Sequence, residues 1–477
     1  MAKHNVRLFL LLGLILLAAP LFAAGGQEKA TTGPKEVVTE GVKLRVAFVP
    51  GLTELPPIED CLIAAAAELG AEIEVSNYSF DELHDKLVID YTGGNTVWDY
   101  VFVQSATRAE WFESGLIEPI GKFIEEHPEL VNEELLAMDD WFQVSMDENT
   151  LDGVLTSLPL YVTGNALYYR TDILEHPEEK ANFRAKYGYN LAPPDTYQQF
   201  RDVAEFFTRK AGQKLMGETL KADFYGASHS NKPINFMWFD FTNVLMAFGA
   251  DNIYDPDTMR PTLNSPETIA AAQYYVDLVP FLPPGHLTMA SGAATAMFAE
   301  GNVALQVEFF GRGALMSLNP ENSKVADKVA FKVDPSVPGK GRDHASIHSG
   351  NGLALYSLSR NIEAAYKVME LAFSPRIMRK VATEKYLPYG WIVPRPSLLK
   401  DPSITSLAPH LEAADQLLDS SKNYFFFLPT LPEYPQCMDI AGTALSKALA
   451  GEQDVVSAFN EAQEKLEDLF KKAGYMK

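Results

Sequence analysis

The stretch INFMWFDF, residues 234–241, combines four aromatic side chains with an amide and a carboxylate. A sugar ring presents C–H groups on its faces and hydroxyls around its edge. Aromatic planes cover such faces, while carboxylates and amides hydrogen-bond the edge. Asn235 and Asp240 therefore give this stretch the composition of a sugar site. Because a helix turns only one face toward a cleft, we expect most of the rings in the core and Trp238 with Asp240 at the ligand.

Three further stretches carry the same mixture: VEFFGR, HSGNG and YLPYGWIVP. Each also has a plain structural interpretation, because aromatic rings fill protein cores and an asparagine between glycines can simply hold a turn. The candidate ligand contacts in these stretches are Glu308, Phe309, Phe310, Asn351 and Trp391.

Motifs for catalysis are missing. The chain has no G-x-S-x-G, H-E-x-x-H, P-loop or C-x-x-C, and no G-x-G-x-x-G follows its first predicted strand. DENTLDG (147–153) resembles a calcium loop only weakly, because Leu151 stands where a ligand belongs. Carboxylates are plentiful, so a glycosidase pair stays open, although nothing singles out two of them. The sequence predicts binding rather than catalysis, with no catalytic residue, metal site or cofactor.

Composition limits the partners. A chain of 477 residues with 47% apolar and 22% charged residues is typical of a globular protein of two or three domains. Its net charge of −23 repels phosphate backbones and anionic lipid, which argues against nucleic acid as a partner. Cys61 and Cys437 leave one disulfide open, because their spacing in sequence says nothing about their distance.

The first 24 residues have the features of a secretory signal peptide. Lys3 and Arg7 precede a long apolar run, which Pro20 interrupts and the pair Ala23–Ala24 closes. The alternative is an N-terminal membrane anchor, for which the run is short. No cysteine lies near the expected cleavage site, so we expect no lipid-modified cysteine. The sequence predicts a periplasmic protein, exported by this segment.

The part that follows predicts an α/β sheet. After a polar leader (25–41), strand patterns at 43–50, 71–78 and 99–104 alternate with helix patterns. Ser79 and Glu82 form a capping box for one of these helices. This is a βαβ series, in which ligands bind beyond the carboxyl ends of the strands. The candidate contacts at these ends are Glu54, Tyr78 and Gln104.

The rest of the chain is mostly helical. Thr196 with Gln199 forms a second capping box, and Ser265 or Asn264 caps another helix that has Pro266 in its first turn. A strand pattern returns at 351–359, before a helix that Asn361 caps. The last helix, over 454–473, has one apolar stripe, typical of a helix packed on a domain: Val455, Val456, Phe459, Ala462, Leu466, Leu469 and Phe470.

Several stretches together resemble one family. They are ESGLIEPIGKFI (113–124), LPLYVTGNALYYRTDIL (158–174), PTLNSPETIAAAQYYVDL (261–278), MFAEGNVALQVEFFGR (297–312), the region from NGLALYSLS to PSLLKDP (351–402) and ALAGEQDVVSAFNEAQEKLEDLF (448–470). In this order they resemble the extracellular solute-binding proteins, family 1, the maltose-type component of bacterial ABC importers. Arg170 replaces the asparagine of the usual L-Y-Y-N-x-D-L pattern.

The resemblance implies a two-lobed periplasmic binding protein fold, type II-like, with ligand in a cleft between lobes joined by crossing strands. The implied parts are a signal peptide (1–24), the leader (25–41), an N-lobe (42–157), a C-lobe (158–345), a return through the N-lobe (346–387) and C-lobe terminal helices (388–477).

The resemblance also implies a reversibly bound sugar or oligosaccharide, membrane permease subunits with an ATPase as partners, and a monomer. Trp238 and Phe309 or Phe310 fall in C-lobe segments that supply aromatic contacts. Tyr434 or Met438 matches a further one, whereas Gln104 departs from the family's usual aspartate. Two alternatives stay open: the same fold binding a polyamine, metal complex or phosphorylated compound, and an exported glycoside hydrolase.

Overall fold

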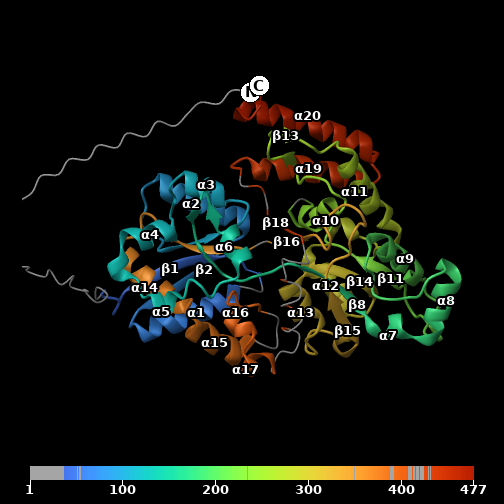
Figure 1. Ribbon diagram of the computed structural model, residues 1–477, viewed down its shortest axis with the longest axis horizontal. Helices are drawn as coiled ribbons and strands as arrows, with labels where there is room; N and C mark the ends of the chain where they lie inside the picture. Colours follow the sequence, from blue (N-terminus) through green and yellow to red (C-terminus); the bar gives the residue numbers. More distant parts are fainter. Residues whose placement is uncertain are drawn as a thin grey trace, which may run out of the picture.

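The structure is a computed structural model in which two α/β lobes lie side by side (Figure 1). It describes residues 37–50, 52, 55–233, 235–348, 350–386, 391–406, 411, 414, 418, 424–427, 429 and 431–476. The predicted signal peptide, most of the leader and Glu54 lie outside these residues. Among the helices described, none is both long and apolar enough to cross a membrane. The predicted two-lobed α/β fold is confirmed.

The N-lobe sheet brings together strands that are far apart in sequence. β1 pairs in parallel with β2, and β3 lies beside β1, because the Asp99 N–H donates to the Arg45 carbonyl over 3.0 Å. β17 pairs antiparallel with β3, β4 and β7. The strand bounds are β1 Lys43–Phe48, β2 Glu72–Asn77, β3 Tyr100–Val103, β4 Ile117–Glu118, β7 Leu158–Pro159 and β17 Gly352–Tyr356. Every residue of β3 and β17 is buried, as in a sheet covered on both faces.

Helices cover this sheet, and the predicted Ser79–Glu82 capping box is present at the start of α2. Asn361 precedes α14, but its side chain binds Asp99 over 3.3 Å rather than capping the helix. The bounds are α1 Leu55–Glu68, α2 Phe80–Thr92, α3 Arg108–Glu113, α4 Ile120–Glu126, α5 Glu133–Leu136, α6 Gln143–Glu148, α14 Ile362–Ala372, α15 Pro375–Val381, α16 Pro396–Leu399 and α17 Pro402–Thr405.

The C-lobe is built on a four-stranded sheet of order β11-β14-β8-β15. β8 occupies a central position, antiparallel to both neighbours, and β11 is parallel to β14. The bounds are β8 Asn165–Arg170, β11 Tyr225–Ser228, β14 Val303–Phe309 and β15 Val329–Lys332. Three two-residue hairpins lie outside these sheets: β5 Thr150–Leu151 with β6 Val154–Leu155, β9 Lys214–Leu215 with β10 Glu218–Thr219, and β12 Tyr254–Asp255 with β13 Arg260–Pro261.

The C-lobe helices begin largely where the sequence predicts. Thr196 and Gln199 form a capping box, and Ser265 caps a helix with Pro266 in its first turn. The last helix packs its apolar stripe inward, but Val456 was placed wrongly: it is 52% exposed. The bounds are α7 Thr171–Glu175, α8 Pro177–Tyr187, α9 Tyr197–Phe207, α10 Asn235–Ala247, α11 Pro266–Asp277, α12 Ser291–Ala299, α13 Phe310–Ser317, α19 Tyr434–Leu449 and α20 Val455–Ala473.

In the part of the chain that the structure describes, three segments connect the lobes, and they lie side by side. The first runs from β7 to β8 (160–165). The second leads from β16, Ser346–Ile347, to β17 (346–351), and the third includes β18, Phe425–Phe426. Asn165 N–H donates to Ser346 Oγ over 2.7 Å, which joins the first segment to the second. His348 N–H donates to the Phe426 carbonyl over 3.0 Å, which joins the second to the third. Figure 1 shows β16 and β18 next to each other between the lobes.

Hydrogen bonds show which lobe the segment after α15 contacts. Arg395 donates to the carbonyls of Leu136, Ala137 and Phe373, and Ser397 Oγ donates to Asp140, all in the N-lobe. Residues 395–397 therefore lie on the N-lobe rather than in the C-lobe part predicted from 388, whereas Phe426 lies in a C-lobe core. Cys61 and Cys437 are both free and lie in different cores, so they form no disulfide.

Candidate functional site

Polar side chains of both lobes gather where the crossing segments run. On the N-lobe side, the loop 104–107 follows the carboxyl end of β3 and leads into α3. Gln104 in this loop is half-buried, and Ala106 packs against a C-lobe core. The predicted position at the end of β3 therefore lies at the junction of the lobes.

A buried carboxylate organises this loop. Glu148, the last residue of α6, is 4% exposed. Its Oε1 accepts a hydrogen bond from Ser105 Oγ over 2.7 Å, and its Oε2 accepts one from the Gly350 N–H over 2.5 Å. His348, fully buried on the second crossing segment, contacts the same carboxylate through Nδ1. One side chain thus holds both the loop and the crossing segment.

A buried guanidinium adds a second connection. Arg108 Nη2 donates to the Gly350 carbonyl over 2.9 Å and to Asn149 Oδ1 over 3.3 Å. Burial lowers the pKa of Arg108, and the nearby charge of Glu148 opposes that shift. Asn149 Oδ1 also accepts from Ser157 Oγ over 2.7 Å. The charges of Glu148 and Arg108 therefore attract each other, and this attraction offsets part of the free energy that burying each charge costs.

Asn351, a predicted ligand contact, is used inside the protein. Its Oδ1 accepts from the Ser105 N–H over 3.3 Å, and its Nδ2 donates to the Tyr161 hydroxyl over 2.7 Å. Its carbonyl accepts from the Leu160 N–H over 3.0 Å. Asn351 thereby braces the loop and the first two crossing segments, and it is only 9% exposed.

The C-lobe contributes a pair of carboxyl groups. Glu308, at 2% exposure, accepts from Thr295 Oγ1 and from the Phe309 N–H, both over 2.8 Å, and pairs with Arg312 over 3.5 Å. Asp240 is half-buried and accepts from the Ser230 N–H over 2.8 Å. Burial and the charge of Glu308 raise the pKa of Asp240 well above its usual range. The predicted residues Asp240 and Glu308 therefore interact with each other.

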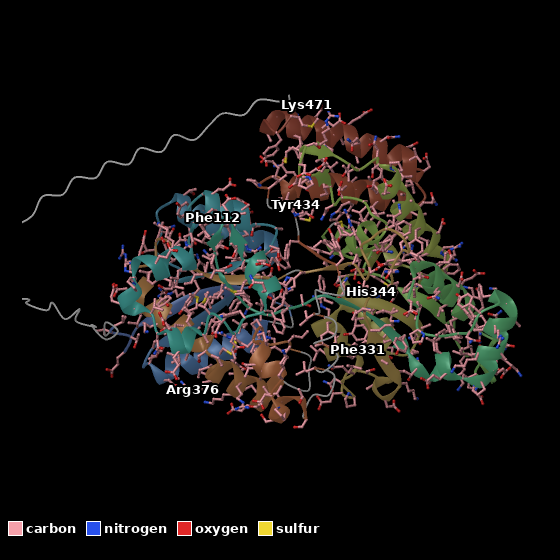
Figure 2. The ribbon with its side chains drawn as sticks, viewed as in Figure 1. Phe112, Phe331, His344, Arg376, Tyr434 and Lys471 are labelled. Carbon is pink, nitrogen blue, oxygen red and sulfur yellow. The ribbon has the colours of Figure 1, made fainter. Side chains whose placement is uncertain are left out.

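Most of the aromatic candidates are buried in cores. Trp238 and Tyr434 lie beside each other in the C-lobe, both with fully buried side chains. Figure 2 shows Tyr434 at the start of α19. Phe310 packs edge-on against Phe331 with ring centres 4.9 Å apart, and Trp391 lies in the N-lobe core. In this conformation these rings fill cores and present no face to a ligand.

Two predicted rings keep exposed surface. Phe309, at the end of β14, is partly buried and packs at the edge of the C-lobe core that Ala106 also touches. Tyr78 is partly exposed but lies in the N-lobe against Trp98, with ring centres 6.3 Å apart and Lys86 Nζ 5.9 Å from its ring. Phe309 lies opposite Asn165, where the first crossing segment enters β8, and Gln104 precedes Ser105, whose N–H donates to Asn351 on the second crossing segment.

Sequence reasoning missed the buried network. Glu148 and Asn149 lie inside DENTLDG, which drew attention only as a weak calcium loop, and His348 opens HSGNG. Arg108 follows the β3 end by only a few positions. A usable signal in the sequence was that ionisable residues such as Arg108, Glu148 and His348 lie close in sequence to the predicted strand ends and lobe-crossing segments.

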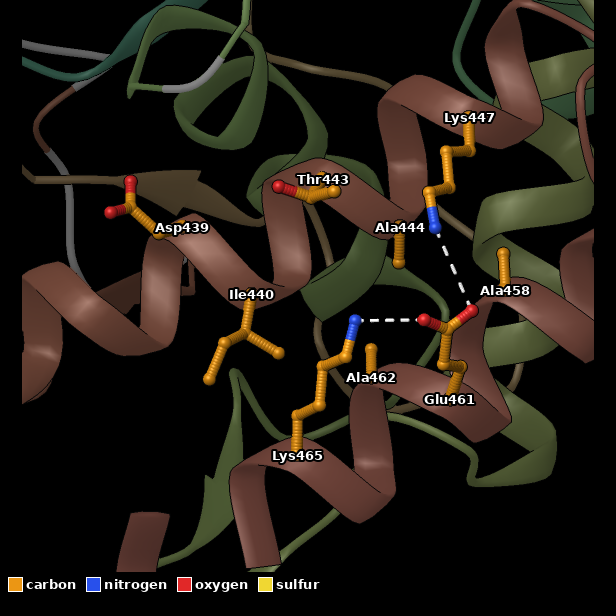
Figure 3. Close-up of a pocket in the computed structure, with 9 residues that line it drawn as sticks. All are labelled: Asp439, Ile440, Thr443, Ala444, Lys447, Ala458, Glu461, Ala462 and Lys465. Carbon is orange, nitrogen blue, oxygen red and sulfur yellow. Dashed lines mark hydrogen bonds and ion pairs between the residues drawn. The ribbon is translucent and has the colours of Figure 1, made fainter. Parts of the chain in front are cut away.

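Among the described residues, the C-lobe has two hollows. A groove of about 220 Å³ between α19 and α20 has a floor of alanines, and both Lys447 and Lys465 pair there with Glu461 (Figure 3). A cavity of about 10 Å³ inside the C-lobe is lined by His229, Asp240 and Asn243 among others. Neither is lined by residues of both lobes, although Asp240 borders the second from inside the C-lobe.

Two α/β lobes, three crossing segments and polar groups of both lobes at their junction define a two-lobed binding protein. The model of the bacterial extracellular solute-binding proteins matches residues 59–379, most of the chain. The chain belongs to this family. Its family and structural neighbours are binding proteins rather than enzymes, and the family is extracellular.

Known proteins give the same result. A probable ABC transporter-binding protein of Deinococcus radiodurans is 28% identical over 251 residues, which cover 52% of this chain and 54% of that protein. A solute-binding protein of Agrobacterium radiobacter in complex with ribitol superposes with a TM-score of 0.73 at 23% identity, covering 91% of this chain and 100% of that one. Maltose-bound MalE3 of T. maritima gives 0.71 at 21% identity, covering 90% and 100%. The structural likenesses at these identities support the fold.

Proposed function

We propose that this protein is the substrate-binding component of an ABC importer and that its ligand is a sugar or a sugar alcohol. The proposal is supported by the backbone positions of Gln104 and Phe309: Gln104 precedes Ser105, which binds Asn351 on the second crossing segment, and Phe309 lies opposite Asn165 at the end of the first. We include Asp240 because its charge interacts with that of Glu308, the neighbour of Phe309. An amide, a carboxyl group and a partly open ring suit hydroxyls and C–H faces. The relatives described above include a ribitol complex and a maltose complex, which agrees with this ligand class.

Binding would act through a shift in population. Open and closed arrangements of the lobes exchange by rotation about the crossing segments, and a ligand that touches both lobes favours the closed one. The closed shape would then deliver the ligand to permease subunits in the membrane, with the predicted signal peptide placing the protein in the periplasm. The ligand leaves unaltered.

A thermal-shift screen tests the proposal. Ribitol, mannitol, maltose, spermidine and an amino-acid mixture are added separately, because a ligand that binds only the folded protein raises its Tm. We expect a shift with a polyol or sugar and none with spermidine. A shift with spermidine alone would replace the sugar by a polyamine, which the acidic chain could also accommodate. New reducing ends after incubation with oligosaccharides would instead indicate a glycoside hydrolase.

Two variants separate ligand contact from packing. Asp240→Asn and Phe309→Ala change groups that keep some exposed surface, so we expect each to weaken binding about tenfold or more with a small loss of Tm. Trp238→Ala removes a fully buried ring, so we expect it to cost about 3–5 kcal/mol of stability. Unchanged affinity in both of the first variants would place the site elsewhere.

A further inference from the structure

Glu148 connects the loop after β3 to the second crossing segment. Its Oε1 accepts from Ser105 in the loop after β3, while its Oε2 accepts from Gly350 on the second crossing segment. The loop carries Gln104, which belongs to the candidate site, and the crossing segment is part of the hinge. The Glu148 carboxylate therefore binds both the loop that carries Gln104 and the crossing segment that forms part of the hinge.

The approach of the crossing segment to this carboxylate is close. A Cβ atom at position 350 would lie 2.6 Å from Glu148 Oε2, a separation that real Cβ atoms essentially never show. Glycine at this position is therefore what allows the backbone N–H to reach the carboxylate. The residue type at 350 and the hydrogen bond depend on each other.

The connection continues through the hinge. His348 contacts Glu148 with its ring and binds the Phe426 carbonyl with its backbone N–H over 3.0 Å. Arg108, three residues after Ser105, donates to the Gly350 carbonyl over 2.9 Å. Loop, second crossing segment and third crossing segment thus form one hydrogen-bonded chain, with Glu148 at its start.

An apolar side chain would fill this position at lower cost in desolvation, since a buried ionised group is stabilising only when its partners are all in place. We propose that Glu148 is a positioning residue that couples the ligand-contacting loop to the hinge, so that ligand contact and lobe closure favour each other. This proposal rests on the proposed function. Reciprocity follows, because a coupling that makes ligand favour closure also makes closure favour ligand.

The test measures the separation of the lobes. Ile63→Cys on α1 and Val456→Cys on α20 place exposed thiols on different lobes, while native Cys61 and Cys437 are buried. Spin labels on these thiols report the distance distribution with and without ribitol or maltose, and labelled protein without the new thiols gives the background. The coupling variants are Glu148→Gln and Ser105→Ala. Glu148→Gln removes the charge but keeps one acceptor oxygen. Ser105→Ala removes only the hydrogen bond from Ser105 Oγ, and it serves as the test if Glu148→Gln does not fold.

Glu179→Gln is the matched control. Glu179 is an equally buried carboxylate, held by Arg209 over 2.6 and 2.9 Å and by the Met216 N–H over 2.7 Å, but it lies within the C-lobe. We expect it to lower Tm while leaving the lobe distances and the affinity unchanged. If Glu148 had a purely structural role, Glu148→Gln would likewise lower Tm and leave the lobe distances and the affinity unchanged.

For Glu148→Gln and Ser105→Ala we expect a broader ligand-free distance distribution and affinity weaker by about fivefold or more. Wild-type distances and affinity in both variants would overturn the proposal, even with a lower Tm. The proposed function fails separately, if no sugar or polyol shifts the wild-type Tm. In that case the ligand-free distributions still decide on the coupling: broadening supports it, and distributions like those of the wild type overturn it.

Discussion

His229 makes the stability of the C-lobe depend on acid. Its ring is buried between Phe200 and Tyr275, with ring centres 6.0 and 5.1 Å away, and burial together with the charge of His286 lowers its pKa from 6.5 to about 4. The folded protein therefore holds this imidazole neutral. Below pH 6.5 the unfolded chain binds a proton that the folded chain refuses, so stability falls as pH falls.

The size of the effect follows from the shift. A shift of about 2.5 pH units at 1.36 kcal/mol each gives about 3 kcal/mol, of which about 2 kcal/mol is lost by pH 5 and nearly all by pH 4. His229→Phe and His229→Gln both remove the titration. The adjoining 10 Å³ cavity gives the phenyl ring some room. Packing changes the stability of either variant at pH 7, so the quantity to compare is the loss between pH 7 and pH 4.

Urea denaturation at pH 7, 6, 5 and 4 measures this loss. We expect the wild type to lose about 3 kcal/mol more than either variant over this range. Tyr275→Phe is the control: it removes the hydroxyl that donates to Asn231 Oδ1 over 3.0 Å but keeps the imidazole, so the acid loss should persist. Equal losses in the wild type and both His229 variants would show that His229 titrates alike in the folded and unfolded states, and the reasoning would fail.

Three further predictions concern buried groups. Burial raises the pKa of Asp334, and neither of its carboxyl oxygens has a hydrogen-bond partner among the described residues, so stability is lost as pH rises above about 3.8. Asp334→Asn should therefore raise Tm at pH 7 and lose that advantage near pH 4, in thermal melts at both pH values. Gly352→Ala would place a Cβ 2.1 Å from Ser157 Oγ, so it should lower the free energy of unfolding by about 1–3 kcal/mol. Gly292 lies in α12 with no atom within 4 Å of an added Cβ, so Gly292→Ala should raise the free energy of unfolding by about 0.5–1 kcal/mol. Urea denaturation measures both changes. Arg395 donates to the carbonyls of Leu136, Ala137 and Phe373 over 2.9, 2.7 and 2.6 Å, and its guanidinium lies 3.8 Å from the ring centre of Trp141. A lysine lacks the planar, forked guanidinium, so Arg395→Lys should lower the free energy of unfolding by about 2 kcal/mol or more in urea denaturation. A variant as stable as the wild type would contradict this reasoning.

The fold was predictable because its signals are local. Capping boxes at Ser79–Glu82 and Thr196–Gln199 lie within four residues, and both are present in the structure. Strand patterns at 43–50 and 71–78 became a parallel pair, as the alternation with helices predicts. The strand pattern at 351–359 predicted β17 itself. Local signals did not predict its antiparallel pairing with β3, because the partner residues lie some 250 positions away.

The site was harder because its contacts are remote in sequence. Glu148 and His348 are 200 positions apart, and Ser105 and Asn351 are 246 apart. Each of these residue types is as common on surfaces as in buried networks, so composition alone does not pair them. Asn351 illustrates the result: its type and its place between glycines suit ligand contact, yet both ends of its amide are taken by Ser105 and Tyr161.

The rings of INFMWFDF show which sequence feature carried the better information. The polar positions among the 13 residues of α10 are Asn235, Asp240, Thr242 and Asn243, and the rest are apolar. A helix with so many apolar positions packs on several sides, and Met237, Trp238, Phe241 and Leu245 are all buried. Asp240 keeps some exposed surface, as its neighbour Phe239 does. Asn243, three positions further on and on the same face, accepts from the Ile347 N–H of the second crossing segment over 2.8 Å. In this helix the polar positions mark the side toward the crossing segments, and the largest ring does not.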